Sequence, residues 1–514
     1  MVLLLAAPFA APLAYLVVRT IDEGGAAGII TDAALLGPLG RSLLLAASVA
    51  AAAAAIGTLA AWLVMRTDLP GRRVLRLLLP LPLVLPSFIG AFALIAAFAP
   101  GGLIEEVLGV GGLPEVGGFR GAFVVLTLLT YPYVYLPAAA RLRQLPPSME
   151  ESARLLGSGP LATFRSVVLP QAWPAIAGGG LLVFLYVIAD FGAVQLLRYD
   201  TLTRAIYANR LIDPAVAATL SLALGVLAIL VVVGQRAMTR GGGPDTRRGG
   251  RPLVVPLGRW RAPALAFTGL LLTLALVAPL AVLGYWAVRG AAEGTDRPNS
   301  FVSDPARLVE PAVNTSVAGA SAAVVAVIVV LPVAFLTVRH RGRLGSGADA
   351  LITGGFALPG IVIALALAFW TLNSPGAIGA LYQTLPLLVG AYALHFGALA
   401  LGPARIAVAS VPRRLDDAAR TLGHGRLSRL WTVDLPLMAP GLAAGAGLVL
   451  LSAMKELPVT LLLAPAGFPT LATRVWSAAE DAFWADASIA ALLLVAVSGV
   501  LTWLLVVRRG RALG

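Results

Sequence analysis

The sequence predicts an all-α polytopic membrane protein of about twelve transmembrane helices, arranged as two parallel six-helix halves. Composition gives the first reason: 59% of the 514 residues are hydrophobic and only 12% are charged, about half the charged share of a soluble domain. The second reason is that the apolar residues form blocks of roughly 17–25 residues, which can cross about 30 Å of hydrocarbon as helices. The third is a repeat, because a shift of 266 residues carries Pro146 onto Pro412 together with much of the sequence around each.

Hydropathy places six spans in each half, and each is expected to be helical because lipid satisfies no backbone hydrogen bonds. The first half has spans near 2–18, 43–65, 77–99, 121–140, 174–196 and 215–234. The second half has spans near 263–286, 313–337, 350–370, 385–408, 440–463 and 487–507. The first block lacks the basic start of a signal peptide and has a counterpart inside the seventh span, so we expect a retained helix.

Arginine distribution predicts the orientation of these spans. Loops expected on one side carry most arginines, in groups such as Arg72/Arg73/Arg76, Arg141/Arg143/Arg154/Arg165, Arg247/Arg248/Arg251, Arg339/Arg341/Arg343, Arg413/Arg414/Arg420 and Arg508/Arg509/Arg511. The opposite loops, such as 101–118 and 291–311, are acidic or nearly neutral. The positive-inside rule therefore predicts a multi-pass membrane protein with both termini cytoplasmic. One loop, 197–214, is expected outside although it contains three arginines.

Charge and residue usage exclude several classes of function. The net charge is +13, but the arginines sit in short loops between apolar blocks, which indicates membrane topology rather than nucleic-acid binding. The absence of cysteine excludes disulfides, thiolate catalysis and cysteine–metal sites. The three histidines, His340, His395 and His424, are far apart in sequence, so we expect no metal site in this chain.

The repeat predicts three segments along the chain. Residues 1–238 form the first half and residues 262–514 the second, in the same orientation because six crossings return the chain to the same side. Between them, residues 239–261 form a Gly/Pro/Arg-rich stretch with the composition of a flexible cytoplasmic linker.

Each half contains one charged, glycine-punctuated segment, at about 146–170 and about 412–436. In the first, Ser148 and Glu151 have the spacing of a capping box, Gly157 is placed to end the helix, and Pro160 can begin a second one. In the second, Gly423 is placed to end the helix. Both segments therefore predict a short helix, a glycine turn, a second short helix and a Leu–Pro return to the membrane.

These two segments resemble the E-A-A–x₃–G–x₉–I–x–L-P loop of binding-protein-dependent ABC import permeases. The matching residues are Glu151, Ser152, Ala153, Gly157, Val167, Leu169 and Pro170 in the first half, and Asp417, Ala418, Ala419, Gly423, Val433, Leu435 and Pro436 in the second. The departures are Ser for Ala at 152, Asp for Glu at 417, and Val for Ile in both copies. Two such loops, in two six-span halves, extend the resemblance over nearly the whole chain.

The resemblance implies that these loops are coupling helices, which bind a cytoplasmic ABC ATPase subunit, in two copies for two loops. It also implies an extracytoplasmic substrate-binding protein. No G-x-x-x-x-G-K-[ST] phosphate loop occurs in the chain, so ATP and Mg²⁺ are expected on the partner ATPase, with no cofactor and no catalytic residue in this chain.

Three ionisable residues stand in apolar spans. Lys455 is the only lysine, it precedes Glu456, and the 266-residue shift places Asp190 opposite Glu456. Charged residues inside a membrane are costly and usually face a polar pathway or each other. Asp190, Lys455 and Glu456 are therefore candidates for the lining of a translocation pathway, with a helix-packing ion pair as the alternative.

The stretch KELPVTLLL (455–463), the stretch ADFG (189–192) and the fusion of both halves resemble ferric-iron permeases most closely. Thiamine, polyamine and sulfate/molybdate permeases are the alternatives. A secondary transporter also has twelve spans in two halves, but that class gives no reason for an acid–small–small–x₃–Gly loop before the fifth span of each half. A membrane-embedded enzyme would need a convergent catalytic set, which the three charged residues do not form.

Overall fold

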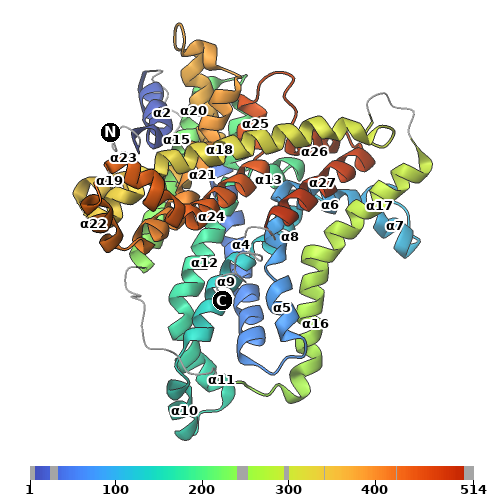
Figure 1. Ribbon diagram of the computed structural model, residues 1–514. Coiled ribbons are helices and arrows are strands. Elements are labelled where there is room, and N and C mark those ends of the chain that lie inside the picture. The colour runs from blue at the N-terminus through green and yellow to red at the C-terminus, as the bar shows by residue number, and fades with distance from the viewer. Residues whose placement is uncertain are drawn as a thin grey trace. The chain divides into compact units, whose positions relative to one another are not determined.

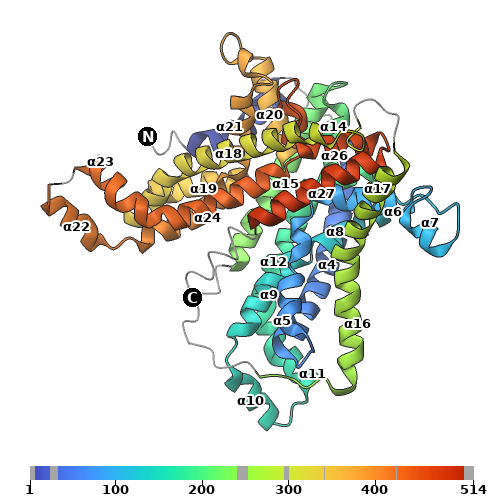
Figure 2. The same cartoon turned by 45° about the vertical axis from the view of Figure 1, so that its right-hand side comes forward.

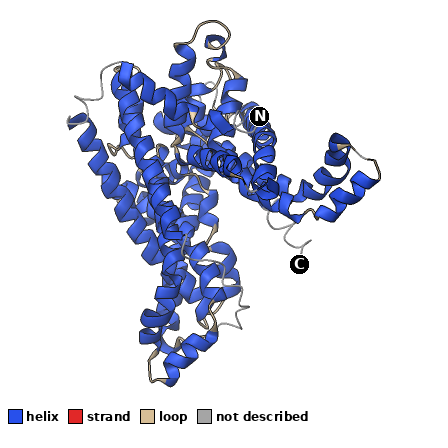
Figure 3. Ribbon diagram, turned by 90° about the vertical axis from the view of Figure 1, so that its left-hand side faces the viewer, coloured by secondary structure: helices blue, strands red, loops and turns tan. Residues whose placement is uncertain are grey.

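The computed structural model describes residues 6–22, 33–239, 253–294, 300–340, 342–423 and 425–502. The regular elements of these ranges are helices, and the described residues form no β-strand (Figure 3). The chain divides into two compact units. The first-half unit comprises Ile30–Ala205 and Val226–Val288, and the second-half unit comprises Met1–Ile29, Ile206–Gly225 and Arg289–Gly514.

The polytopic all-α prediction is confirmed, with a smaller number of full spans. Among the described residues, ten helices are long and apolar enough to cross a membrane, or eleven if one bent pair is counted as a span. Residues 2–5 of the predicted first span, 2–18, lie outside the described part of the structure, and its described residues include most of the short helix α2 (Ala11–Asp22). With 12 residues it falls short of the roughly 20 needed for a full crossing.

Proline divides two other predicted spans. The span predicted at 77–99 is three pieces, because Pro80, Pro82 and Pro86 lack backbone N–H groups and interrupt helical hydrogen bonding. The span predicted at 350–370 is the bent pair: α19 (Arg343–Ala357) and α20 (Gly360–Leu372) meet at an angle of 101° around Pro359. Each break ends in a Leu–Pro pair directly before a new helix.

The first-half unit is built around three long helices that pack on one another: α4 (Ala33–Arg66), α9 (Pro132–Gln144) and α12 (Leu169–Ala189). Small residues let these helices approach closely, as in many membrane bundles. A Cβ on Gly57 of α4 would stand 2.8 Å from the carbonyl oxygen of Tyr131, and one on Gly179 of α12 would stand 2.8 Å from the carbonyl oxygen of Tyr133.

Shorter elements complete the first-half unit (Figure 1). They are α5 (Arg72–Leu78), η2 (Leu81–Val84), α6 (Ser87–Phe98), α7 (Leu103–Leu108), α8 (Gly118–Thr130), α10 (Pro147–Leu155), α11 (Pro160–Thr163), η3 (Phe164–Val168), α13 (Gly192–Leu196), η4 (Gly258–Trp260), α16 (Arg261–Leu272) and η5 (Thr273–Val277). Three helices contribute residues to both units: α14 (Leu202–Asn209), α15 (Pro214–Thr239) and α17 (Ala278–Glu293).

The second-half unit repeats the three-helix core with α18 (Val309–Phe335), α21 (Leu385–Ser410) and α24 (Leu435–Met454). Its other elements are η1 (Ala7–Phe9), α2, η6 (Pro305–Leu308), η7 (Leu336–His340), α19, α20, η8 (Gly379–Leu381), α22 (Arg413–Thr421), α23 (Arg426–Arg429), η9 (Leu430–Asp434), α25 (Pro458–Leu463), α26 (Leu471–Glu480) and α27 (Trp484–Thr502).

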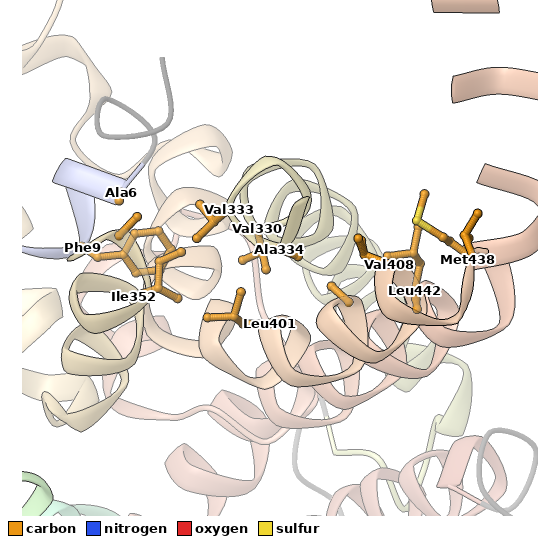
Figure 4. Close-up of a cluster of buried hydrophobic side chains, with 14 residues drawn as sticks. Ala6, Phe9, Val330, Val333, Ala334, Ile352, Leu401, Val408, Met438 and Leu442 are labelled. Carbon is orange, nitrogen blue, oxygen red and sulfur yellow. The ribbon is translucent and has the colours of Figure 1, made fainter. Parts of the chain in front are cut away.

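Each unit includes the first span of the opposite sequence half. In the second-half unit, Phe9 lies in a buried apolar cluster with Val330, Ile352 and Leu401 (Figure 4). In the first-half unit, the indole N–H of Trp286, from the predicted seventh span, donates to the carbonyl oxygen of Ala96 at 2.9 Å. The compact units therefore differ from the sequence halves 1–238 and 262–514, whose boundaries stay a prediction about the repeat.

Two of the three arginines of the loop 197–214, which oppose the positive-inside rule, have local partners. Arg204 forms an ion pair with Asp200 one turn away. The guanidinium of Arg210 lies 3.5 Å from the ring centre of Tyr207. These contacts offset part of their positive charge within the loop itself.

Candidate functional site

The first predicted coupling segment has the expected helix–turn–helix form. Helix α10 covers Pro147–Leu155 and ends before Gly157, whose φ of +87° belongs to the left-handed region. A residue with a side chain is strained there, so glycine is the natural helix stop. The second short helix, α11, begins at Pro160, and Leu169–Pro170 open α12. The predicted local geometry is confirmed.

The predicted capping box is wrong. Helix α10 already begins at Pro147, its N-cap is Pro146, and no side chain caps it. Proline suits the first helical position because its missing N–H needs no partner there. Ser148 consequently stands inside the first turn, where its carbonyl oxygen accepts from the Ser152 hydroxyl at 2.8 Å.

The two neighbouring acids of α10 have opposite environments. Glu151, the acid of the predicted motif, is exposed, whereas Glu150 is only 3% exposed and forms an ion pair with Arg66 at the end of α4. Sequence reasoning missed this pair, since 84 positions separate its members. The available signal was an arginine at the end of an apolar span and a second acid beside the motif.

The exposed surface of α10 combines small and apolar residues. Ser152 is exposed and Ala153 half-buried, while Leu155 and Leu156, at the helix end, are 89% and 87% exposed. Large exposed leucines outside a membrane span are a feature of protein-binding surfaces. The segment thus presents an acid, small residues and two leucines to a partner.

The second predicted coupling segment has the same backbone form. Helix α22 ends before Gly423, whose φ is +83°, and α23 and η9 lead to Leu435–Pro436 at the start of α24. Figure 2 shows α22 and α23 projecting from the end of α24. The side chain of Asp417 lies outside the described part of the structure. Ala418 is exposed and Ala419 is buried.

Asp190 stands where the predicted fifth span, 174–196, is broken. Helix α12 ends at Ala189, and the Asp190 carboxylate accepts hydrogen bonds from the backbone N–H groups of Ala193 and Val194, at 3.0 and 3.4 Å, at the start of α13. The hydroxyl of Ser87, at the start of α6, also hydrogen-bonds this carboxylate. Because helix N-termini favour negative charge, Asp190 holds two helix starts together.

Lys455 and Glu456 stand at the equivalent break of the predicted eleventh span, 440–463. Lys455 terminates α24, with its backbone N–H donating to the carbonyl oxygen of Ser452 at 3.2 Å. The Glu456 carboxylate accepts from the N–H of Val459 in α25 at 3.3 Å. It also lies against Gly360 at the start of α20, where a Cβ would collide with it.

The structure thus gives Asp190 and Glu456 a helix-capping role that the sequence interpretation had not included. The pathway role of Asp190, Lys455 and Glu456 stays a prediction. Among the described residues, no group of three or more His, Cys, Asp or Glu side chains is arranged to hold a metal ion.

The repeated geometry agrees with a comparison of the sequence with protein families. Residues 53–240 and residues 326–509 each match the family described as binding-protein-dependent transport system inner membrane component. The chain belongs to this family. One match lies in each half and includes that half's coupling segment and helix break, so the resemblance and the duplication inferred from the sequence are both confirmed. The family is one of transport proteins rather than of enzymes.

Some relatives of this permease align with most of its length, and others align with only part of it. It is 29% identical to the Fe(3+)-transport system permease protein FbpB 2 of Haemophilus influenzae, over 98% of the chain and 97% of that relative. It is 28% identical to a probable ABC transporter permease of Sinorhizobium fredii, over 85% and 80% of the two proteins. The molybdenum transport system permease protein ModB of Mycobacterium tuberculosis is 35% identical over 34% of this chain and 68% of its own length.

Proposed function

We propose that this chain is the membrane subunit of an ATP-driven importer that moves ferric iron into the bacterial cytoplasm. A cytoplasmic ATPase, in two copies, binds α10 and α22 and holds the ATP and Mg²⁺. An extracytoplasmic binding protein delivers the ferric ion, which this chain passes on as substrate. Both termini then lie in the cytoplasm, as the positive-inside rule predicts.

One observation carries the proposal: two segments of the same helix–glycine–helix form lie in a chain that aligns from end to end with a ferric permease. The glycine φ angles of +87° and +83° give both segments the same turn. The alignment covers 98% of this chain and 97% of the Haemophilus protein, so it includes both coupling segments. A single-half relative offers no such end-to-end correspondence.

The coupling surface proposed here consists of one set of residues in each segment. These are Glu151, Ser152, Ala153, Gly157, Leu169 and Pro170 in the first, and Asp417, Ala418, Ala419, Gly423, Leu435 and Pro436 in the second. The exposed Leu156 and Leu422, at 87% and 78%, add an apolar contact next to each glycine. The acid, the small residues and the leucine give an ATPase cleft one charged and one apolar contact.

Reconstitution tests the substrate and the energy source together. The chain is purified with the ATPase and the binding protein that assemble with it, and placed in liposomes containing ATP. We expect uptake of radioactive ferric iron that requires the binding protein and hydrolysable ATP. Uptake without ATPase, driven by an ion gradient, would instead indicate a secondary transporter.

A second substrate class, molybdate or sulfate, is favoured by the higher identities of the shorter relatives. The molybdenum permease is 35% identical, and a Salmonella typhimurium sulfate permease is 33% identical over 27% of this chain. The same liposomes therefore receive labelled molybdate and sulfate with the same binding protein. ATP-dependent uptake of either oxyanion, with none of iron, would replace ferric iron as the substrate.

Two variants of the second segment test the docking assignment. Gly423→Pro removes the turn, and Asp417→Lys reverses the charge of the motif acid, the fifth residue of α22. We expect both proteins to insert in the membrane but to lose the ATPase on purification and to transport no substrate. Normal assembly and normal transport in either variant would remove that segment from the coupling surface.

A further inference from the structure

Arg66 is the last residue of α4 and is 1% exposed, although its side chain is a cation. One guanidinium nitrogen donates to the carbonyl oxygen of Leu142, in the last turn of α9, at 3.0 Å. Another forms the ion pair with Glu150 of α10. A single side chain therefore joins the end of one long membrane helix to the helix before the coupling segment and to the coupling helix itself.

The backbone of Arg66 adds a third attachment at the same place. Its carbonyl oxygen accepts from the N–H of Val255 at 2.8 Å. Two residues further on in each of the two segments, the Asp68 carboxylate accepts from the N–H of Leu257, also at 2.8 Å. Asp68 also pairs with Arg261 at the start of α16. Together, the Arg261 guanidinium and the Leu257 N–H lower the pKa of Asp68, which keeps this carboxylate ionised.

Apart from the ion pair, α10 packs against α11 and η3, the two elements that follow it in the chain and complete a helical hairpin with it. Figures 1 and 2 show α10 and α11 at the end of the first-half unit where α9 ends and α12 begins. Breaking a buried pair leaves an uncompensated charge. The pair is thus a direct and costly-to-break link between this hairpin and α4.

The second-half unit contains an equivalent of one of these contacts, the hydrogen bond from an arginine to a backbone carbonyl. Arg339 lies in η7, directly after the core helix α18, much as Arg66 lies at the end of the core helix α4. Its guanidinium donates to the carbonyl oxygen of Val411, between α21 and α22, at 2.8 Å. In both units, then, an arginine at the end of a core helix holds the backbone next to the coupling helix.

We propose that Arg66 is a positioning residue for coupling: through Glu150 it fixes α10 to α4, so that α4 moves when the ATPase displaces α10. This inference rests on the proposed function, because it takes α10 to be the site of ATPase contact. Its specific claim is that the link acts mechanically, and that the two charges touch neither the ATPase nor the substrate.

A cysteine pair tests this claim, because the chain contains no cysteine of its own. The double variant Arg66→Cys/Glu150→Cys removes both charges, so no unpaired charge stays buried. A short bis-maleimide reagent then rebuilds the link covalently. Transport and ATP hydrolysis are measured in liposomes with the ATPase and binding protein, before and after cross-linking.

We expect the uncross-linked variant to bind its ATPase and hydrolyse ATP. The amount of substrate that it transports per ATP should be at least about fivefold lower than that of the parent protein. Cross-linking should restore most of this ratio. Arg72→Met is the matched control: Arg72 also donates to a backbone carbonyl, that of Thr67 at 2.9 Å, and is not part of the link. This control should keep the parent ratio.

Two results would overturn the inference. One is a parent-like ratio in the uncross-linked variant, and the other is a low ratio that cross-linking leaves unchanged. Arg66→Met/Glu150→Gln gives the same decision if the cysteine pair disturbs folding, since it also removes both charges, nearly keeps the side-chain sizes and should still lower the ratio. Failure of the proposed function is distinct, because the parent protein itself would then neither bind the ATPase nor couple ATP to uptake.

Discussion

Asp190 in the first-half unit and Glu456 in the second-half unit occupy equivalent helix breaks but are supported differently. Both carboxylates accept from N–H groups of the short helix that follows, and both face the start of a helix that begins after a Leu–Pro pair. At that start the first break has Ser87, whose hydroxyl reaches the shorter acid. The second has Gly360, which leaves room for the longer acid.

The difference shows that the acid and the first residue of the facing helix vary together. An aspartate needs a neighbour that extends toward it, whereas a glutamate needs one that leaves space. The backbone carbonyl oxygens of the two acids also have the same kind of partner from different places in the sequence. That of Asp190 accepts from the Thr203 hydroxyl and that of Glu456 from the Thr460 hydroxyl, each at 2.6 Å. A common backbone arrangement is thus stabilised by two different sets of side chains.

Removing the acid of the first break should have the largest effect on stability. Asp190→Ala leaves the N–H groups of Ala193 and Val194 without a carboxylate acceptor, and we expect the free energy of unfolding to fall by about 2–4 kcal/mol. Asp190→Asn keeps one acceptor oxygen and should cost about 1 kcal/mol. Thermal unfolding of the purified protein in detergent measures both.

Asp200→Ala is the control for this pair of variants, because Asp200 is an exposed acid of the same unit in a surface ion pair. Its stability should change by no more than about 0.5 kcal/mol. Equal losses for Asp190→Asn and Asp190→Ala would show that hydrogen-bond acceptance is not the role of Asp190. A stable Asp190→Asn protein that transports nothing would favour the pathway role.

Replacing the Glu456–Gly360 combination by the Asp–Ser combination of the first break should have the next largest effect on stability. Gly360→Ser places a Cβ against the Glu456 carboxylate, and such overpacking costs about 1–3 kcal/mol. Adding Glu456→Asp rebuilds the Ser–Asp combination of the first break and should recover at least half of the loss. Unfolding temperatures of the single and double variants decide this, and a double variant no more stable than Gly360→Ser would contradict the matched pairing.

Much of the fold was predictable because it depends on local sequence. Long apolar blocks gave the spans, and two glycines followed by a Leu–Pro pair gave both coupling segments. The helix breaks at Asp190 and Glu456 were missed, because mean hydropathy stays high across them and treats each span as continuous. A local signal was present, since each acid stands directly before the N-cap residue of the next short helix, Phe191 or Leu457, in an otherwise apolar stretch.

Contacts between distant parts of the chain could not be predicted. The pair Arg66–Glu150 and the burial of Phe9 among residues of the second half depend on which helices pack together, and hydropathy does not specify packing partners. The capping box at Ser148 failed for a local reason, as the helix begins at Pro147, two residues earlier than a cap at Ser148 requires. The sequence analysis placed Lys455 and Glu456 inside one continuous span, 440–463, whereas α24 ends at Met454, directly before them.

A substitution at Lys455 tests whether the second break has an additional role. Ala189 precedes Asp190 as Lys455 precedes Glu456, so Lys455→Ala copies the first break into the second. We expect a stability change within about 1 kcal/mol. If Lys455 lines the translocation pathway, as the sequence predicts, transport should nevertheless fall roughly fivefold, equivalent to about 1 kcal/mol. Unchanged uptake by the stable variant would remove Lys455 from the pathway.

The coupling segments should show the smallest difference between the units, because their turns have nearly the same backbone angles. Gly157→Ala and Gly423→Ala each put a side chain in the left-handed region, which costs about 1 kcal/mol. If the ATPase binds only the correctly turned segment, each variant should bind it about fivefold more weakly. Titration of the ATPase onto the purified permease measures this affinity.

Glycines two positions later supply the controls for this prediction. Gly159 and Gly425 are absent from the positive-φ residues of the described chain, and a Cβ on either meets no atom within 4 Å. Gly159→Ala and Gly425→Ala should therefore bind the ATPase like the parent protein. The Gly157→Ala and Gly423→Ala effects should agree within about twofold and add in the double variant, as expected for independent sites. A loss confined to one segment would mean that the two equal turns serve unequal docking sites, and the acids Glu151 and Asp417 would then be the first residues to exchange.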